Sequence, residues 1–420
     1  MNSFNTNINC YSESEALEES SKCLKCRNPK CVSACPLNNN IPKFIGLISE
    51  GKLAEARMVL DSTSGFSDIC SYVCYSENKC MGSCIRKKID KAVNIKKLEK
   101  YVALNTTPNP DIKSKNNIKL CVIGSGPAGL AFARDALING YDVTIFERHN
   151  HLGGLLRYAI PTFRLPRVRV TAIETELLGL GLKFITKNVQ SIEEIPGFDY
   201  YFLATGTSKT KSAGIEGETL NGVLDWTTFL SRPNSYNYIE SKDVCIIGGG
   251  NVAIDCARVA SRLGANVSIL YRRGINDMPC NLEELNRALS ENIKIIEYRK
   301  PLSISKQNSL TVENIITKPG EVASDGRRSI INTSEHQCFN YDYIIKAIGS
   351  EAEEFDNVLL SKGKVLVDEH YQTNITNVYA IGDVVSGATT VTDAIRHGKD
   401  VFSYIDKLIK RKLTRNTSSN

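Results

Sequence analysis

The fold is set by a β-branched run and the glycine loop behind it, Ile118-Lys119-Leu120-Cys121-Val122-Ile123-Gly124-Ser125-Gly126-Pro127-Ala128-Gly129. A short apolar run of this kind is typical of a buried strand in a parallel sheet. Glycines spaced as G-x-G-x-x-G let the backbone turn tightly and approach a pyrophosphate, and the following helix offers free N–H groups. The stretch therefore predicts a strand, a tight turn and a helix that bind a dinucleotide.

An acidic residue stands where such a site needs one. The next apolar run, 142–146, ends in Glu147, which lies 21 positions after Gly126. A carboxylate there can accept hydrogen bonds from an adenosine ribose. The competing interpretation is a tight strand–helix turn without a ligand. We predict that the first dinucleotide is bound by Gly124, Gly126, Pro127, Ala128, Gly129 and Glu147.

A second copy of the strand–turn–helix unit follows. The run 243–247 leads into Gly248-Gly249-Gly250-Asn251-Val252-Ala253, which fits G-x-G-x-x-A. Its second strand, 267–270, ends not in an acid but in Tyr271-Arg272-Arg273. Arginine binds a 2′-phosphate through two hydrogen bonds, so the pair favours NADPH over NADH. A solvated arginine pair is the alternative. The predicted residues are Gly248, Gly250, Asn251, Val252, Arg272 and Arg273.

The cysteines gather near the N-terminus, with nine of 14 before Leu120. Seven form two spaced groups, Cys23-x2-Cys26-x4-Cys31-x3-Cys35 and Cys74-x5-Cys80-x3-Cys84. Thiolates are soft ligands that suit iron–sulfur clusters, although C-x2-C also begins many zinc sites. Seven cysteines exceed one zinc site and leave two cubane clusters one ligand short. We therefore predict two [4Fe–4S] clusters.

Composition narrows the classes further. The chain has 420 residues, enough for two or three domains, and a net charge of +6 that is no argument for nucleic acid. No apolar run is long enough to span a membrane, and residues 1–5 lack the features of a signal peptide, so cytoplasm is expected. A basic stretch from Arg86 to Lys100 is either a solvated helical face or a docking surface for an acidic partner such as ferredoxin.

The C-terminal part carries a further motif, Val378-Tyr379-Ala380-Ile381-Gly382-Asp383, followed by Gly387-Ala388-Thr389-Thr390. It resembles the signature of the flavoprotein reductases with two dinucleotide-binding domains. The resemblance implies that the aspartate hydrogen-bonds the flavin ribityl chain and that the next helix directs its N-terminus at the flavin C2 carbonyl. It also implies that the first site holds FAD. The residues that it adds to this site are Gly154, Leu155, Gly382, Asp383 and Thr390.

The segment from Cys23 to Cys84, with Val93–Glu99 behind it, resembles the N-terminal domain of glutamate synthase small subunits. Dihydropyrimidine dehydrogenase and the large subunit of NADH-dependent ferredoxin:NADP oxidoreductase have a similar domain. The resemblance implies a first cluster on Cys23, Cys26, Cys31 and Cys84, and a second on Cys35, Cys74, Cys80 and Glu99. Cys70 is the alternative eighth ligand. Two departures are Tyr75, where relatives often have Pro, and Ala159, where they usually have Gly.

The expected fold is α/β: two Rossmann-like three-layer dinucleotide-binding domains behind an α-helical iron–sulfur domain. We assign residues 1–112 to the clusters, 113–225 and 350–420 to FAD, and 226–349 to NADPH. The expected function is NADPH oxidation, with electrons passed from FAD through the clusters to a partner. That partner is a glutamate synthase large subunit. Alternatively, the chain is the large subunit of a ferredoxin-linked, bifurcating transhydrogenase, and its partner is ferredoxin or a small flavoprotein subunit. Neither nucleic acid nor a membrane is expected as a partner.

Two other functions are disfavoured. A disulfide reductase of the thioredoxin reductase type needs a C-x-x-C beside the flavin, and none follows Cys26. A non-catalytic electron-wiring scaffold would not need two complete glycine loops with their strand-end partners. Because the cofactors supply the hydride chemistry, we name no general acid or base.

Overall fold

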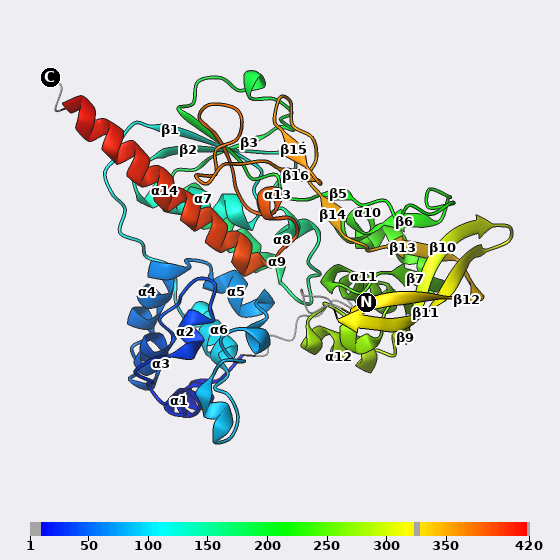
Figure 1. The fold of residues 1–420 in the computed structure, drawn as a ribbon. Helices are drawn as coiled ribbons and strands as arrows, with labels where there is room; N and C mark the ends of the chain where they lie inside the picture. The colour runs from blue at the N-terminus through cyan, green and yellow to red at the C-terminus, as the bar shows by residue number, and fades with distance from the viewer. Residues whose placement is uncertain (1–9, 323–327, 418–420) are drawn as a thin grey trace. The chain divides into compact units, whose positions relative to one another are not determined.

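The computed structural model describes residues 10–322 and 328–417 (Figure 1). The described residues form two compact units. The larger unit comprises 10–157, Thr162–Thr207 and 352–417, and the smaller unit comprises Tyr158–Pro161 and Ser208–Glu351. The outermost parts of the expected domains, 1–9 and 418–420, lie outside the described residues. Residues 1–5, where no signal peptide is expected, are among them.

The larger unit begins with a helical domain. Ser12 caps the first helix through a complete capping box, and the side chains of Asn40 and Asn94 cap two later helices, so local polar residues set these boundaries. Buried side chains such as Phe44 and Leu98 form its core. The helices are α1 (Glu13–Ser21), α2 (Lys30–Ser33), α3 (Ile41–Ser49), α4 (Leu53–Thr63), α5 (Ser67–Val73), η1 (Ser76–Asn78), η2 (Ile85–Lys88) and α6 (Ile95–Asn105).

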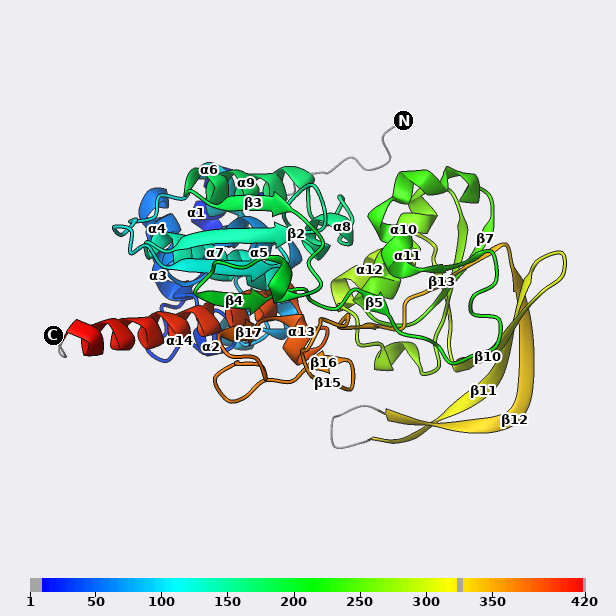
Figure 2. The ribbon, with the colours of Figure 1, turned by 90° about the horizontal axis from the view of Figure 1, so that it is seen from above.

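The same unit contains a five-stranded parallel sheet in the order β17-β4-β1-β2-β3 (Figure 2). Its strands are β1 (Lys119–Ile123), β2 (Asp142–Glu147), β3 (Lys183–Thr186), β4 (Tyr200–Leu203) and β17 (Val378–Ala380). The accompanying elements are α7 (Pro127–Ile138), α8 (Leu155–Tyr158), α9 (Arg167–Gly179), η3 (Ile192–Glu194), β15 (Leu360–Ser361), β16 (Lys364–Val365), α13 (Asp383–Ser386) and α14 (Val391–Thr417). Helix α14 packs closely on α7, because a Cβ added at Gly398 would lie 2.2 Å from the Ala128 carbonyl oxygen.

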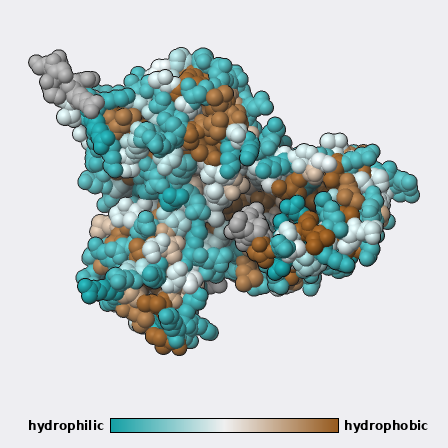
Figure 3. All heavy atoms as spheres, viewed as in Figure 1, coloured by the Kyte–Doolittle hydropathy of each residue, from teal (hydrophilic) through white to brown (hydrophobic). Residues whose placement is uncertain are grey.

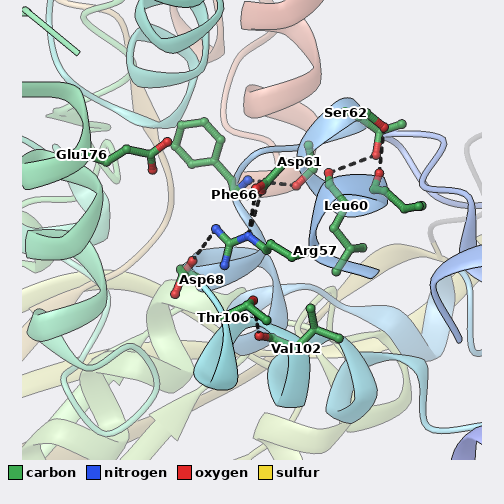
Figure 4. Close-up of polar contacts among 12 residues, drawn as sticks. Arg57, Leu60, Asp61, Ser62, Phe66, Asp68, Val102, Thr106 and Glu176 are labelled. Atoms are coloured by element: carbon green, nitrogen blue, oxygen red, sulfur yellow. Dashed lines mark hydrogen bonds and ion pairs between the residues drawn. The ribbon is translucent and has the colours of Figure 1, made fainter. Parts of the chain in front are cut away.

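A buried ion-pair network joins the helical domain to α9 of the sheet domain. The Arg57 side chain, 2% exposed, pairs with Asp61 at 3.0 Å and with Asp68 at 3.0 Å (Figure 4). Arg169 of α9 contacts the same Asp68 at 3.4 Å. Removing one member of a buried network leaves an uncompensated charge, so the loss of any one of these residues is expected to be destabilising.

The smaller unit repeats the parallel sheet, in the order β6-β13-β7-β8-β9. Its strands are β6 (Val223–Asp225), β7 (Asp243–Ile247), β8 (Asn266–Leu270), β9 (Lys294–Ile296) and β13 (Tyr343–Lys346). The other elements are α10 (Trp226–Ser231), η4 (Pro233–Ile239), α11 (Asn251–Arg262), η5 (Ile275–Asp277) and α12 (Leu282–Ser290), the antiparallel sheet of β10 (Arg299–Lys306), β11 (Leu310–Val322) and β12 (Arg328–Tyr341), and the pair β5 (Lys209–Thr210) and β14 (Ser350–Glu351).

The two parallel sheets share one strand order. In each, the strand that precedes the glycine loop stands third, with the next strand of the chain on one side. The expected α/β class, with two Rossmann-like domains behind a helical cysteine-rich domain, is confirmed. The smaller unit begins at Ser208, earlier than the boundary expected at 226, since β6 pairs with β13. Among the described residues, no helix is long and apolar enough to cross a membrane.

Candidate cofactor sites

The glycine loop of the larger unit leaves open space at the start of α7. Gly124 has a φ of +99°, and a Cβ there would lie 2.6 Å from the Ala204 carbonyl oxygen, so the tight turn requires a glycine. Gly126 differs, because it has an ordinary φ of −67° and an added Cβ would meet nothing within 4 Å. Gly126 is also the N-cap of α7, with Pro127 at the first helical turn. The free space therefore lies beside the N-terminus of α7, where an anion is stabilised.

Glu147 lies beside this loop, at the end of β2. One of its carboxylate oxygens accepts hydrogen bonds from the Ser125 N–H at 3.0 Å and the Ser125 hydroxyl at 2.7 Å. The other accepts one from the His149 N–H at 3.0 Å. Ser125 also accepts a hydrogen bond from the Gly153 N–H at 3.1 Å. Ser125 thus ties the acid to both glycine segments, a role that the motif spacing did not reveal.

The two later segments of the expected FAD site reach the same place. A Cβ at Gly154 would lie 2.9 Å from the Gly126 Cα, and one at Gly382 would lie 2.6 Å from the Ala128 Cβ. Leu155 follows Gly154 as the first residue of α8. The structure therefore brings together, around the start of α7, residues that lie far apart in sequence.

Asp383 follows Gly382 at the start of α13. Its carboxylate accepts a hydrogen bond from the Thr389 hydroxyl at 2.6 Å, and burial raises the pKa of Asp383. The Gly382 N–H donates to His397 Nδ1 of α14 at 2.8 Å, which means that this nitrogen carries no proton. Burial lowers the pKa of His397, in agreement with a neutral ring. Asp383 is therefore held on a fixed loop by groups from α14 and the segment before it.

The glycine loop of the smaller unit also combines glycines that the tight turn requires with one that faces open space. Gly248 has a φ of +145°, and a Cβ there would lie 2.3 Å from the Ala347 carbonyl oxygen. A Cβ at Gly249 would overlap the Tyr271 ring. At Gly250, the N-cap of α11, the φ is −86° and an added Cβ would meet nothing within 4 Å. Here, too, the open space lies at a helix N-terminus.

The other predicted residues of this second site surround the same loop and strand. The Asn251 side chain, in the first turn of α11 with Val252, accepts a hydrogen bond from the Asn281 N–H at 2.7 Å. Arg272 and Arg273 follow β8, and their surroundings differ. The Arg273 Nε donates to the Arg328 carbonyl at 2.6 Å, whereas the Arg272 side chain is exposed. Arg272 is consequently the better placed of the two to bind an added anion.

A first cavity in the helical domain collects four of the predicted cysteine ligands. The loop before α2 supplies Cys23 and Cys26, α2 itself supplies Cys31, and the residue that caps η2 is Cys84. Apolar side chains such as Ile41 and Ile45 line much of the remaining wall. Burial raises the pKa of the Cys31 thiol to about 11 and also raises that of Cys23. The four thiols are those of Cys23, Cys26, Cys31 and Cys84.

A second cavity collects the remaining predicted ligands, Cys35, Cys74, Cys80 and Glu99, together with Cys70. Burial raises the pKa of Cys74 to about 12 and that of Glu99 to about 7. Glu99 is 8% exposed, and its Oε1 has no hydrogen-bond partner among the described residues. An unpaired buried oxygen in a cavity lined by four thiols is costly unless it binds something.

These donor sets fit cubane clusters. Within residues 10–322 and 328–417, no three His, Cys, Asp or Glu side chains converge on a single metal ion. In a cubane each ligand binds a different iron, so its ligands surround a cavity instead of meeting at one point. Binding requires deprotonated thiols, and the raised thiol pKa values imply that cluster assembly releases protons. The unpaired Glu99 oxygen and the Cys70 thiol both line the second cavity, so either could be the donor beyond Cys35, Cys74 and Cys80.

Sequence reasoning missed Lys79, which links the second cavity to α14. Its Nζ donates to the hydroxyls of Thr392 at 2.9 Å and Thr390 at 3.1 Å, and pairs with Asp393 at 3.3 Å. Thr392 itself lines the second cavity. The available signal was a lysine between Cys74 and Cys80, but nothing in that spacing names a partner more than 300 residues away.

Fold and sites together define an α/β protein with two dinucleotide-binding folds behind a cysteine-rich helical domain. Residues 118–398 match the family described as pyridine nucleotide-disulphide oxidoreductase. Residues 1–109 match the 4Fe-4S cluster domain described as dihydropyrimidine dehydrogenase domain II. The chain belongs to the pyridine nucleotide-disulphide oxidoreductase family, as a homologue of glutamate synthase small chains, and is an oxidoreductase.

Named relatives cover almost the whole chain. It is 31% identical to the glutamate synthase (NADPH) small chain of Escherichia coli (strain K12), over 93% of this chain and 90% of that protein. It is 32% identical to the protein of that name from Azospirillum brasilense, over 96% and 91%. The structure of Mycobacterium tuberculosis FprA in complex with NADPH has a TM-score of 0.60 at 17% identity, covering 72% of this chain and 86% of that one, and supports the fold alone. The resemblance inferred from the motifs is confirmed.

Proposed function

We propose that this oxidoreductase oxidises NADPH with a bound FAD and passes the electrons through two [4Fe–4S] clusters to a partner protein, as the small chain of a glutamate synthase. The observation that carries the proposal is the pair of cavities in the helical domain, one lined by four thiols and the other by cysteines and an orphaned carboxylate. Their unit also contains the glycine loop at α7. The identity to NADPH-dependent small chains over most of both proteins supports the same function.

In the larger unit, the residues suit FAD. The free space at Gly126 and the N–H groups that begin α7 would bind its pyrophosphate, and Glu147 would accept hydrogen bonds from its adenosine ribose. Asp383 and the start of α14, at Thr390, would bind the ribityl chain and the flavin ring, with Gly154 and Leu155 closing the adjacent wall. When bound, FAD accepts a hydride and releases single electrons.

In the smaller unit, the residues suit NADPH. The space at Gly250 and the start of α11, through Asn251 and Val252, would bind a second pyrophosphate. Arg272 would bind the 2′-phosphate, because its guanidinium is exposed at a strand end that carries no acid. Arg273 would support it as a second positive charge while bonded to the chain at Arg328. These residues bind and orient the nucleotide; none is needed to move a proton.

The helical domain would bind the clusters. Cys23, Cys26, Cys31 and Cys84 would hold the first, and Cys35, Cys74, Cys80 and Glu99 the second. The apolar walls exclude water, which protects cluster sulfur from hydrolysis and sets the local electrostatics. Since Thr392 of α14 lines the second cavity, the second cluster would lie nearer to the flavin and pass electrons to the first.

Anaerobic titration of the purified holoprotein with NADPH tests the proposal. We expect bleaching of flavin absorbance followed by electron paramagnetic resonance signals from reduced clusters, with about eight irons per chain. Holoprotein that carries neither flavin nor iron, or flavin that NADPH leaves oxidised, would end the proposal. A second experiment identifies the partner. We expect the protein to co-purify with a large amidotransferase-type chain, and the two chains together to form glutamate. If the protein instead reduces NAD and ferredoxin when it is combined with a small flavoprotein, the ferredoxin-linked alternative is the function.

A further inference from the structure

The first cavity borders the surface at which, on the proposed electron path, electrons would pass to the partner protein. We propose that this surface, formed by residues 22–31 and 84–91 and called the basic rim below, is the docking site of an acidic electron-accepting protein. The inference deepens the proposed function and rests on it, because the first cluster must be present for docking to matter.

The walls of the two cavities differ in origin. Those of the first come from residues 23–95 alone, within the helical domain. Those of the second include Thr392, which belongs to the first turn of α14. Thus the second cavity meets the sheet domain, whereas the first is bordered by the basic rim. An electron that leaves the chain from the first cluster leaves through this rim.

Large apolar side chains are exposed on the basic rim. Leu24 is 47% exposed, Ile85 is 38% exposed and Ile89 is 71% exposed, and the first two line the cavity itself. Figure 3 shows brown, hydrophobic patches bordered by teal, hydrophilic residues on the helical domain at the lower left. Single exposed apolar residues are ordinary, but three beside one cofactor cavity provide the apolar centre of a small interface.

The charge on this rim has one sign. Residues 22–31 and 84–91 contain eight Lys or Arg residues and a single acid, Asp90. Some are used within the chain: Lys22 pairs with Glu19, and the Arg86 guanidinium donates to the Lys22 carbonyl. Exposed basic residues with no side-chain hydrogen bond or ion pair to the described part of the chain are Lys25, Arg27, Lys30, Lys88 and Lys91.

Such a surface selects its partner by chemistry. An apolar centre with a basic rim is complementary to a small interface rimmed by Asp and Glu, the arrangement of transient electron-transfer encounters. Attraction between opposite patches speeds diffusional encounter and weakens with salt. A nucleic acid would be attracted by the positive charge, but its phosphate backbone would then lie against the apolar side chains of Leu24, Ile85 and Ile89. The occupant is therefore an acidic redox protein.

The test uses the holoprotein, reduced by NADPH, with a small acidic [2Fe–2S] ferredoxin as probe and a basic cytochrome c as the opposite probe. Two charge-reversal variants carry the test, Arg27→Glu with Lys30→Glu and Lys88→Glu with Lys91→Glu. The matched control is Lys115→Glu with Lys407→Glu, which reverses two exposed lysines outside the rim. The readouts are stopped-flow ferredoxin reduction, ferredoxin binding to the oxidised protein, and flavin reduction by NADPH.

We expect each rim variant to lower the second-order rate of ferredoxin reduction at least tenfold at low ionic strength, and to weaken ferredoxin binding in parallel. Flavin reduction by NADPH and the cluster signals stay unchanged, and cytochrome c reduction does not fall. In the unaltered protein, the ferredoxin rate falls as salt rises. Ile89→Ser is expected to weaken binding without changing that salt dependence.

Equal loss in the rim and control variants, a rate that ignores salt, or a preference for cytochrome c would overturn the docking site. The docking site would also be overturned if random-sequence duplex DNA displaced bound ferredoxin as well as unlabelled ferredoxin does. The surface would then bind any polyanion without specificity. These failures leave NADPH-dependent flavin and cluster reduction intact. Failure of the proposed function is different, because the flavin or the clusters would then not be reduced at all.

Discussion

Lys79 Nζ lies 2.9 Å from the Thr392 hydroxyl and thereby connects the cysteine-rich domain to the first turn of α14. The lysine follows η1, between two predicted ligands of the second cluster, and the threonine lines that cluster's cavity. Asp393 completes the contact as the counter-charge at 3.3 Å. One side chain therefore reaches from the segment that would bind a cluster to the helix that would face the flavin.

Replacing Lys79 tests whether its contact with α14 couples the flavin site to the second cluster. We expect Lys79→Met to lower the free energy of unfolding by about 1–3 kcal/mol, because partly buried acceptors lose a charged donor. Electron transfer from reduced flavin to the clusters slows, while hydride transfer from NADPH does not. Urea denaturation and anaerobic stopped-flow spectroscopy measure the two effects. Lys52→Met, which removes an exposed lysine paired with Glu50, is the control. Identical behaviour of the two variants would show that the Lys79 contact is incidental.

Two glycines that face open space distinguish binding from folding. We expect Gly126→Ala to reduce flavin content and retain iron, and Gly250→Ala to weaken NADPH binding and retain flavin. Both backbones suit alanine, so unfolding free energies stay within about 1 kcal/mol of the original protein. Absorbance, iron assay and NADPH titration check these outcomes. Gly179→Ala, also in open space but within α9, is the silent control. Full flavin content in Gly126→Ala would remove the pyrophosphate from this loop.

The arginine pair predicts a nucleotide preference. We expect Arg272→Ala to weaken NADPH binding by about 1.5–3 kcal/mol, the worth of hydrogen bonds to a charged group, and to leave NADH binding nearly unchanged. Arg273→Ala alone has a smaller effect on this preference, because its side chain already bonds the Arg328 carbonyl. The double variant shows the larger loss. Dissociation constants for both nucleotides measure it, and an equal loss of NADH binding would refute the 2′-phosphate role.

The eighth cluster ligand is decided by a comparison of two variants. We expect Glu99→Ala to lose about half of the iron and one of two cluster signals, whereas Cys70→Ala retains both. The reason is that the Glu99 Oε1 is unpaired in the second cavity. Glu55→Ala removes an exposed helical glutamate and serves as control. The reverse pattern, with iron lost only in Cys70→Ala, would assign the position to the thiol.

The ion pair between Glu218 and Lys346 in the smaller unit predicts that the stability of the protein depends on pH. Burial would raise the pKa of Glu218, but hydrogen bonds from Ser212, Ala213 and Lys346 outweigh it and lower that pKa to about 2. Because the folded pKa lies below the unfolded value of 4.5, the stabilisation is complete above pH 4.5 and is lost as the pH falls toward 2. Thermal unfolding from pH 7 to pH 2 should therefore show a smaller decline for Glu218→Gln. Parallel curves for both proteins would contradict the assignment.

Local patterns in the sequence were sufficient for the strands β1, β2, β7, β8 and β17, for the two glycine loops, and for the starts of α7 and α11. A tight turn needs glycine at Gly124 and Gly248 whatever the rest of the chain does, and cysteine spacing is a property of neighbouring residues. The α/β class and the family followed from these. The contacts of Ser125 with Glu147, of Arg273 with Arg328, and of Lys79 with Thr392 did not.

By itself, the sequence determined which chemistries this protein carries: two phosphate-binding turns, a strand-end acid and a strand-end arginine, and two groups of thiols. Only the tertiary structure decided which of these meet. Ser125 meets Glu147 and Lys79 meets Thr392 because elements pack over long sequence separations, and packing depends on the shape of the whole core rather than on any local spacing.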